Sequence, residues 1–289
     1  MLEDVVSLDP GLAVAHAMLG FMRASQTVNG WTEKGGADLA DGIASAETTI
    51  RLDPKEALAH FAHALGLQYA GRLEEATAAA ERAIALDPNL CHVHGVMGSS
   101  VLFIGRPEAA LHYLDIAMRL DPYFPNVLLH LCALAHYMLG DYQRSRALLE
   151  QQMALKVETD STPFVLASCN GRLGNAEAAA RAWRQVSEAN ADFSVAQRRR
   201  SASYREIRHF DDIVEGLRLA GIDPDTAPGL GLRLDDRLHH QVAQQHAIMQ
   251  AVFDALHHVN HDHAFDRIDP EISAGVAAPV ILPLGAGPG

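Results

Sequence analysis

The densest group of potential metal ligands lies near the C-terminus, where seven of the sixteen histidines fall between residues 239 and 263. Histidine and aspartate are common zinc ligands. If residues 254–263 form a helix, His257 and His261 lie four residues apart on one face, with Asp254 three residues before His257. These three side chains are the candidate ligands of a metal-binding protein or an enzyme. The alternative is an amphipathic helix or a disordered tail, because the sequence defines neither a further ligand nor an outer shell.

A second concentration of charged groups is basic and comprises residues 198–200, Arg205 and Arg208. Nucleic-acid binding would need supporting aromatic or groove-entering residues, which this segment lacks. The whole chain has 36 acidic and 23 basic residues and a net charge of -13, which repels phosphate backbones and anionic membranes. We therefore expect a solvated helix face that contacts the acidic first half of the chain or a partner domain, with no binding to nucleic acid or membrane.

Other chemistry is poorly supported. Nucleophilic serine motifs, phosphate-binding Gly-Lys loops and dinucleotide-binding motifs do not occur in a strand-turn-helix context. Cys91, Cys132 and Cys169 are 41 and 37 residues apart, which fits neither a disulfide framework nor a zinc site. The N-terminus is acidic, and the longest apolar stretch, 127–139, is interrupted by two histidines. These features predict a cytoplasmic protein without a cofactor.

The elements that carry these residues follow a repeat of 34 residues. Leu-Asp-Pro occurs four times, and its prolines are separated by 44, 34 and 34 residues. A second series of residues, Gly71, Gly105, Gly140 and Gly174, keeps steps of 34, 35 and 34. A repeat of this length is typical of an α-solenoid.

Each repeat reads as two helices. Apolar residues recur at spacings of three and four in 57–70 and again in 76–86, and Gly71 interrupts the pattern between them. The prolines stand where one unit ends and the next begins, so a preceding residue such as Asp53 or Asp87 could cap the following helix. The chain is therefore predicted to be all-α.

These marks resemble the tetratricopeptide repeat (TPR). When the final proline of that family is aligned with Pro88 and Pro122, small residues fall at the family's turn and helix-contact positions, namely Gly71, Gly105, Ala76, Ala110, Ala83 and Ala117.

The resemblance implies a right-handed α-solenoid over residues 1–190, with about five helical hairpins. The repeats lie near 13–54 with an insertion at 27–36, and near 57–88, 91–122, 126–157 and 160–191. Capping helices are expected over 191–222. Residues 223–289 are expected to form a linker, a His-rich helix and a disordered tail.

Their positions in the repeat predict structural roles for some histidines and for one cysteine. His16, His60 and His94 occupy the fourth position of their repeats. A residue that recurs at one structural position points to packing rather than catalysis. Cys132 falls where the family has a leucine, which predicts a buried and unreactive thiol.

The resemblance also implies where a partner would bind. In TPR proteins the second, fifth, ninth and twelfth positions of the first helix line the concave groove. The corresponding residues are Leu58, Phe61, Leu65 and Gln68, then His92, Gly95, Ser99 and Leu102, with Phe103 one position further on, and then Val127, His130, Leu134 and Tyr137. The lysine and asparagine that clamp a terminal carboxylate in chaperone-binding relatives are missing. We therefore expect a protein or peptide ligand held by apolar contacts, with Phe61, Phe103 and Tyr137 as anchors, or with these rings packed against the next repeat instead.

A narrower resemblance covers roughly residues 1–222. The Trp31-bearing insertion, the stretch 193–204 and the motif 210–221 look like the C-terminal TPR region of bacterial class III adenylate cyclases, which also follows winged-helix domains in some transcriptional regulators. No strand-rich block suited to a cyclase domain occurs in the sequence. The chain is therefore expected to be a non-enzymatic interaction module of a cyclase or a regulator, present as a fragment or as a separately encoded partner without cyclase activity of its own.

Overall fold

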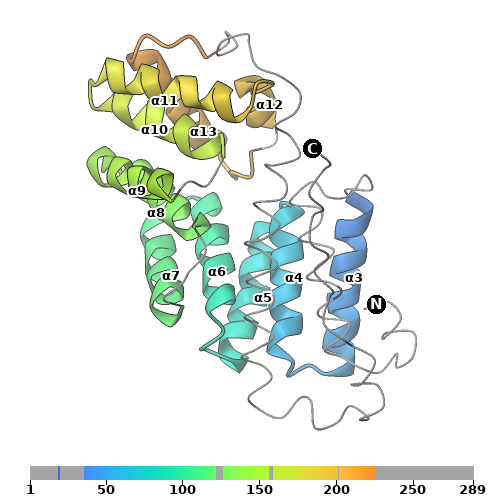
Figure 1. Ribbon diagram of the computed structural model, residues 1–289. Coiled ribbons are helices and arrows are strands. Elements are labelled where there is room, and N and C mark those ends of the chain that lie inside the picture. The colour runs from blue at the N-terminus through green and yellow to red at the C-terminus, as the bar shows by residue number, and fades with distance from the viewer. Residues whose placement is uncertain (1–18, 20–35, 122–125, 156–158, 201, 225–289) are drawn as a thin grey trace, which may run out of the picture. The chain divides into compact units, whose positions relative to one another are not determined.

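The computed structural model describes residues 19, 36–121, 126–155, 159–200 and 202–224, all within the first of the two compact units of the chain, Met1–Gln245. Within these ranges every regular element is a helix, which confirms the all-α prediction (Figure 1). Most of the first predicted repeat, including His16 and nearly all of its insertion, lies outside them, as does the tail from 225 onward. The helices are α3 (Gly36–Leu52), α4 (Ala57–Tyr69), α5 (Leu73–Leu86), α6 (Cys91–Ile104), α7 (Pro107–Leu120), α8 (Val127–Met138), α9 (Tyr142–Ala154), α10 (Ser161–Arg172), α11 (Ala176–Ala189), α12 (Val195–Arg200) and α13 (Arg208–Leu219).

The helices pack as consecutive hairpins. The pairs α4–α5, α6–α7, α8–α9 and α10–α11 each join through a short turn, and the second helix of each hairpin packs on the first helix of the next. Helix α3 packs on α4 in the same manner, and Figure 1 shows α3 to α7 side by side. This is a TPR-like solenoid, in which each hairpin buries its apolar face against its neighbours.

The periodic glycines close the hairpins. Gly105 has φ 99°, a left-handed conformation that a side chain with a Cβ rarely adopts. Its N–H donates to Leu102 O over 2.9 Å, and the N–H of Arg106 donates to Val101 O over 2.9 Å. This pattern satisfies carbonyls that would otherwise be orphaned at the helix end. The same closure occurs at Gly71, Gly140 and Gly174.

The aspartates of the Leu-Asp-Pro segments do not have the helix-capping role that the sequence predicted. Helices α4 and α6 begin three residues after the proline, so the aspartates do not cap them. Instead, Asp53 Oδ1 accepts the N–H of Lys55 and Asp87 Oδ1 accepts that of Asn89, each over 2.9 Å. Aspartate therefore stabilises the turn before the helix, because its short side chain bonds readily to an amide two residues later.

The recurring histidines have the expected packing role. His60 Nε2 lies 3.1 Å from Pro54 O, and His94 Nε2 lies 2.9 Å from Pro88 O. Both side chains are buried. Each imidazole therefore ties the first helix of a hairpin to the proline carbonyl of the preceding turn.

The C-terminal helices were expected to cap the end of the solenoid. Helix α13 packs chiefly on α10, the first helix of the last hairpin, through Phe210, Ile213, Val214 and Leu217. A Cβ added at Gly216 would lie 2.1 Å from Ser168 Oγ, and one at Gly171 would lie 1.8 Å from Gly216 O. The two backbones therefore touch, and α13 covers α10, the first helix of the last hairpin.

We predict that Gly105→Val and Ala110→Val each lower the free energy of unfolding by roughly 1–4 kcal/mol. Valine is strained at the positive φ of Gly105, and Ala110 is fully buried at the hairpin contact. Urea unfolding measures both effects. Arg106→Val is the control, because this exposed neighbour has an ordinary φ of -117°. Control-like stability of both variants would contradict the assigned register.

Candidate functional site

The predicted groove positions on α4 and α6 are largely used for packing within the chain. Ser99 Oγ donates to Gln68 Oε1 over 2.7 Å, and both side chains are buried between α4 and α6. Phe61 is 7% exposed and Leu102 is 0% exposed. These four side chains are not free for a partner, which corrects that expectation. The half-buried side chains of this group are Leu58, Leu65, His92 and Phe103.

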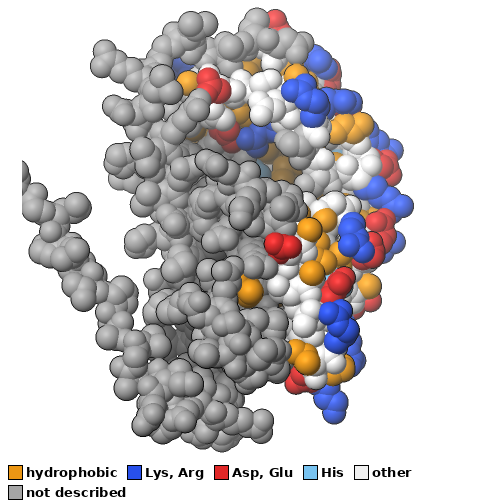
Figure 2. Space-filling model, turned by 90° about the vertical axis from the view of Figure 1, so that its right-hand side faces the viewer, with side chains coloured by type: hydrophobic (Ala, Val, Ile, Leu, Met, Phe, Trp, Pro, Cys, Tyr) orange, Lys and Arg blue, Asp and Glu red, His pale blue; other side chains and the backbone are white. Residues whose placement is uncertain are grey.

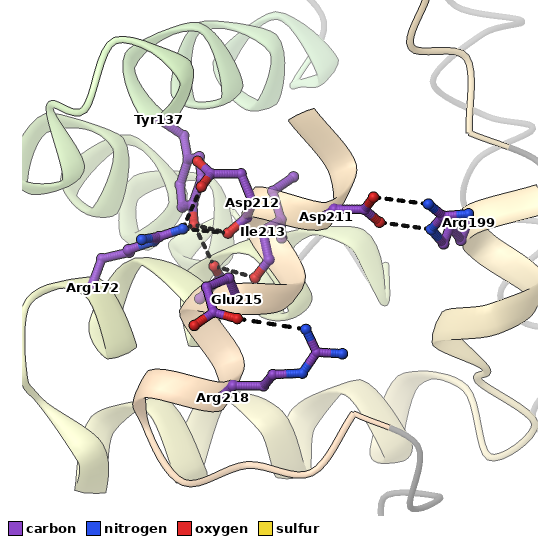
Figure 3. Close-up of polar contacts among 9 residues, drawn as sticks. Tyr137, Arg172, Arg199, Asp211, Asp212, Ile213, Glu215 and Arg218 are labelled. Atoms are coloured by element: carbon purple, nitrogen blue, oxygen red, sulfur yellow. Dashed lines mark hydrogen bonds and ion pairs between the residues drawn. The ribbon is translucent and has the colours of Figure 1, made fainter. Parts of the chain in front are cut away.

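Tyr137 is likewise a core residue, contrary to its expected role as an anchor. Its side chain is 1% exposed, and its hydroxyl lies 2.7 Å from Ser168 Oγ and 3.0 Å from Asp212 O (Figure 3). Arg172 Nη2 donates to the same carbonyl over 2.8 Å and also pairs with the Asp212 carboxylate. Burial raises the pKa of Tyr137 to about 12. The ring therefore joins α8 to α10 and α13.

The third expected anchor, Phe103, is half-buried beneath a segment that precedes α13. The Tyr204 ring meets it edge-on at 5.3 Å, and the N–H of Arg205 donates to Phe103 O over 2.9 Å. Arg205 also pairs with Glu74 over 2.5 Å. The alternative considered for this ring was packing against the next repeat, whereas the contacts described here are with the segment at Tyr204 and Arg205 that precedes α13.

Four of the five arginines in the basic cluster pair with acidic side chains. Arg198 pairs with Asp160, Arg199 with Asp211, Arg205 with Glu74 and Arg208 with Glu206. The Arg205 pair confirms that the cluster contacts the acidic first half of the chain. On the coloured part of the face shown in Figure 2, basic and acidic side chains are interspersed.

A cavity of about 560 Å³ opens where α13 and α12 face α8 and α10. This volume lies in the range of ordinary ligand pockets. It brings two predicted groove residues together with side chains from five other parts of the chain. The lining residues are His130, Leu134, Ser161, Phe164, Val165, Asn190, Asp192, Phe193, Ser194, Gln197, Arg198, Ala202, Tyr204, Phe210 and Ile213.

Aromatic rings form the apolar wall of the cavity. The Phe164 ring contacts two of the others, with ring-centroid distances of 5.3 Å to Phe193 and 5.9 Å to Phe210. The Arg198 guanidinium stacks over Phe193 at 5.0 Å. Such rings offer large contact areas with few rotors to freeze.

The polar wall centres on the Arg198–Asp160 ion pair. Arg198 Nη1 donates to Ser161 Oγ over 2.7 Å, and Asn190 Nδ2 donates to the Asp160 carboxylate over 2.8 Å. These bonds fix the guanidinium beside its counter-charge. The pair therefore contributes rigidity to the cavity and little net charge.

His130 is the unusual polar group of the cavity. Its Nδ1 is buried and has no hydrogen-bond partner. Burial lowers the pKa of His130 to about 4, and the positive charge of Arg198 lowers it further in the same direction. The imidazole is therefore neutral at pH 7, with one ring nitrogen unsatisfied.

Sequence reasoning missed most of this cavity. The predicted register found His130 and Leu134, but Phe164, Phe193 and Phe210 come from three segments whose meeting depends on how α13 folds back. The weak available signal was the cluster of aromatic and arginine residues between 193 and 210.

Metal and thiol chemistry gain no support from the described residues. Among them, no group of three or more His, Cys, Asp or Glu side chains could hold a metal ion. The candidates Asp254, His257 and His261 lie outside the described ranges. Burial raises the pKa of Cys132 to about 11, so this thiol stays protonated, as its expected core position implies.

No helix in the described part of the chain is long and apolar enough to span a membrane.

Comparison with known proteins supports the fold. No family model matches the chain. A segment of 76 residues is 38% identical to "Putative adenylate cyclase 3" of Rhizobium meliloti (strain 1021), covering 26% of this chain and 13% of that relative. The crystal structure of PilW, a type IV pilus biogenesis factor, is similar with a TM-score of 0.54 and 17% identity, over 71% of this chain and 90% of that one.

A chain of the APC/C hetero-tetramer Cut9–Hcn1 is also similar, with a TM-score of 0.56 and 16% identity, over 76% of this chain and 43% of that one. At such identities the two structural likenesses show the helical-repeat fold alone.

We predict that Tyr137→Ala lowers the free energy of unfolding by roughly 3–5 kcal/mol, because it leaves a cavity between three helices. Tyr137→Phe keeps the ring and should cost about 1–2 kcal/mol, since polar groups around Ser168 and Arg172 lose their shared partner. Urea unfolding measures both values. Wild-type stability of the alanine variant would contradict the core role and restore the groove interpretation.

We also predict that stability falls as pH is lowered from about 6.5 to about 4. The unfolded chain protonates His130 near its ordinary pKa of 6.5, whereas the folded chain protonates it near 4, so the unfolded state binds more protons in this window. The loss from this residue approaches roughly 3 kcal/mol. Arg198, Asp160 and Gln152 are the groups that act on this imidazole.

Unfolding free energies of the wild type and of His130→Phe, measured from pH 8 to pH 4, test this expectation. His63 and His136 also have pKa values lowered by burial, so the difference between the two proteins is the relevant quantity. Parallel curves for the two proteins would show that His130 is not the responsible group.

Proposed function

We propose that this chain is a protein-interaction scaffold that binds a peptide or protein segment in the cavity between α8, α10, α12 and α13. The observation that carries the proposal is a cavity on a TPR-like frame whose walls combine a cluster of aromatic rings with polar side chains. Aromatic side chains in preformed pockets commonly dominate binding energy at protein interfaces. The terminal-carboxylate clamp is missing, and Arg198 is already paired with Asp160, so apolar contact is the main source of affinity.

The binding surface is smaller than the groove expected from the sequence. Helix α13 covers α10, and Tyr204 covers Phe103 on α6, so these parts of the face formed by the first helices are occupied by the chain itself. His130 and Leu134 are the predicted groove residues that line the cavity. Leu58, Leu65 and His92 would extend the contact to a longer partner.

The effector proposed for this scaffold is a nucleotide cyclase, with a TPR-bearing transcriptional regulator as the alternative. The first choice is supported by the 76-residue similarity to "Putative adenylate cyclase 3", of whose length the chain covers 13%. The scaffold would regulate or localise the effector through its bound segment, without catalysing the reaction. A cytoplasmic location is part of this proposal, because Cys91, Cys132 and Cys169 are free thiols.

We predict that Gln197→Trp abolishes capture of the native partner without unfolding the protein. Gln197 is exposed on α12 and lines the cavity, so a bulky ring there obstructs the pocket. The full-length variant and wild type are used as bait in a lysate of the native host, and retained proteins are identified by mass spectrometry. The result expected is a protein retained by the wild type, such as a cyclase, and lost with the variant.

The matched control is Ala196→Trp, which places the same ring on the adjacent exposed position that does not line the cavity. Thermal melting checks that both variants fold. Equal retention of every partner by wild type, Gln197→Trp and Ala196→Trp would move the binding site away from the cavity.

A further inference from the structure

The segment between α12 and α13 passes the C-terminal end of α6 without forming a helix. We call residues 202–206 of this segment the strap. Three of its five side chains are exposed, and the other two, Ala202 and Tyr204, are half-buried. The strap is therefore held on the solenoid by individual contacts, because it has no buried core of its own.

Those contacts are of the kinds that a bound peptide makes. The Tyr204 ring meets Phe103 edge-on with 5.3 Å between the ring centroids, and its centroid lies 6.2 Å from that of His209. The N–H of Arg205 donates to Phe103 O over 2.9 Å, and its guanidinium pairs with Glu74 over 2.5 Å. Aromatic anchors, main-chain hydrogen bonds and charge pairs recur in peptide recognition. The strap therefore contacts the solenoid in the manner of an internal ligand.

The end of α6 supplies the acceptor for the main-chain bond. The last four carbonyls of a helix have no amide partner within it. The turn at Gly105 satisfies the carbonyls of Val101 and Leu102. Phe103 O is left for a donor from elsewhere in the chain or from another molecule, and in this structure the strap provides that donor.

The same place favours a positively charged ligand. The C-terminal end of a helix carries a partial negative charge, which attracts arginine and lysine. Glu74, in the first turn of α5, adds a full negative charge beside it. The Arg205 and Glu74 side chains are 58% and 60% exposed, so their pair contributes selectivity more than strength. The aromatic ring is then the main source of affinity.

We propose that the end of α6, with Phe103, His209 and Glu74, is a binding site for an aromatic residue followed by arginine in a partner segment, and that the strap occupies this site until the partner displaces it. Ala202 and Tyr204 also line the cavity, so displacement removes part of the cavity wall. The inference goes beyond the proposed function, whose binding site is the cavity.

Peptides test the proposal on the full chain. Acetyl-Ala-Ser-Tyr-Arg-Glu-Ile-amide copies residues 202–207. It is compared with peptides in which alanine replaces the tyrosine or glutamate replaces the arginine. Dissociation constants are measured by calorimetry for the wild type and for Tyr204→Ala/Arg205→Ala, whose strap loses its aromatic anchor and its charge pair. Thermal melting checks that this strap variant folds.

We expect the copied peptide to bind the strap variant about tenfold more tightly than the wild type, because the strap keeps the wild-type site occupied in most molecules. In the strap variant, the alanine and glutamate peptides should each bind about fivefold more weakly than the copied peptide, or worse. Equal affinity of the wild type and the folded strap variant would overturn the proposal. So would equal binding of the three peptides.

A further substitution locates the site that the peptide occupies. Glu74→Gln in the strap variant should reduce the preference for arginine over glutamate by about two- to fivefold. The matched control is Glu81→Gln, which changes an exposed glutamate about two turns further along α5 and should leave the preference unaltered. A preference that is the same in both would place the peptide elsewhere and overturn the assignment.

A second readout uses the wild type alone and does not depend on a variant that folds. The Arg205 amide is hydrogen-bonded to Phe103 O, so we expect it to be protected from exchange with solvent in the free protein. In ¹⁵N-labelled protein, saturation with the copied peptide should remove this protection, and the glutamate peptide should leave it in place. Protection that persists at saturation would contradict displacement of the strap.

The cavity and the site at α6 are tested separately. Gln197→Trp obstructs the cavity and leaves Phe103 and Glu74 unchanged. If it removes the native partner while no peptide displaces the strap, this inference fails and the proposed function stands. If the copied peptide displaces the strap while Gln197→Trp removes nothing, the proposed function of the cavity fails and the site at α6 stands.

Discussion

The contact between α10 and α13 is the constraint on which the rest of this structure depends. At Gly171 and Gly216 the two backbones approach so closely that a Cβ at either position would overlap the other helix. Around this contact, the Tyr137 and Ser168 hydroxyls and the Arg172 guanidinium reach the backbone carbonyls of α13. A helix held in this way adds a further wall to the solenoid. The cavity exists because that wall stands opposite α8 and α10.

Several residues predicted to line the groove are used for packing within the chain instead. In a stack of hairpins, the same first helices supply both the packing between repeats and the surface on the concave side. Phe61 and Gln68 are drawn into the contacts between hairpins, and Tyr137 is covered by α13. What remains open on this side is a bounded pocket lined by both polar and apolar side chains. A bounded pocket selects one side chain at a time, whereas an open groove reads an extended segment along several repeats.

The pairing of charged side chains also limits what the pocket can attract. The chain has a net charge of -13, and its basic cluster is the segment whose charge would attract an anion. Four of its arginines instead pair with carboxylates, and the pair Arg198–Asp160 lies at the wall of the cavity. The pairs of Arg199, Arg205 and Arg208 are exposed and contribute little stability each, whereas Arg198–Asp160 is partly buried and leaves the pocket with little net charge.

The sequence by itself determined the hairpins. The glycine step of about 34 residues specifies left-handed turns, and the positions of His60 and His94 specify local bonds to proline carbonyls, because both depend on residues close together in the chain. The sequence also located His130 and Leu134 by register. Only the tertiary structure decided that Tyr137 is core and that Phe164 and Phe210 share a cavity. Those facts depend on where α13 returns along the solenoid, and this contact joins residues some 45 positions apart that no local pattern links.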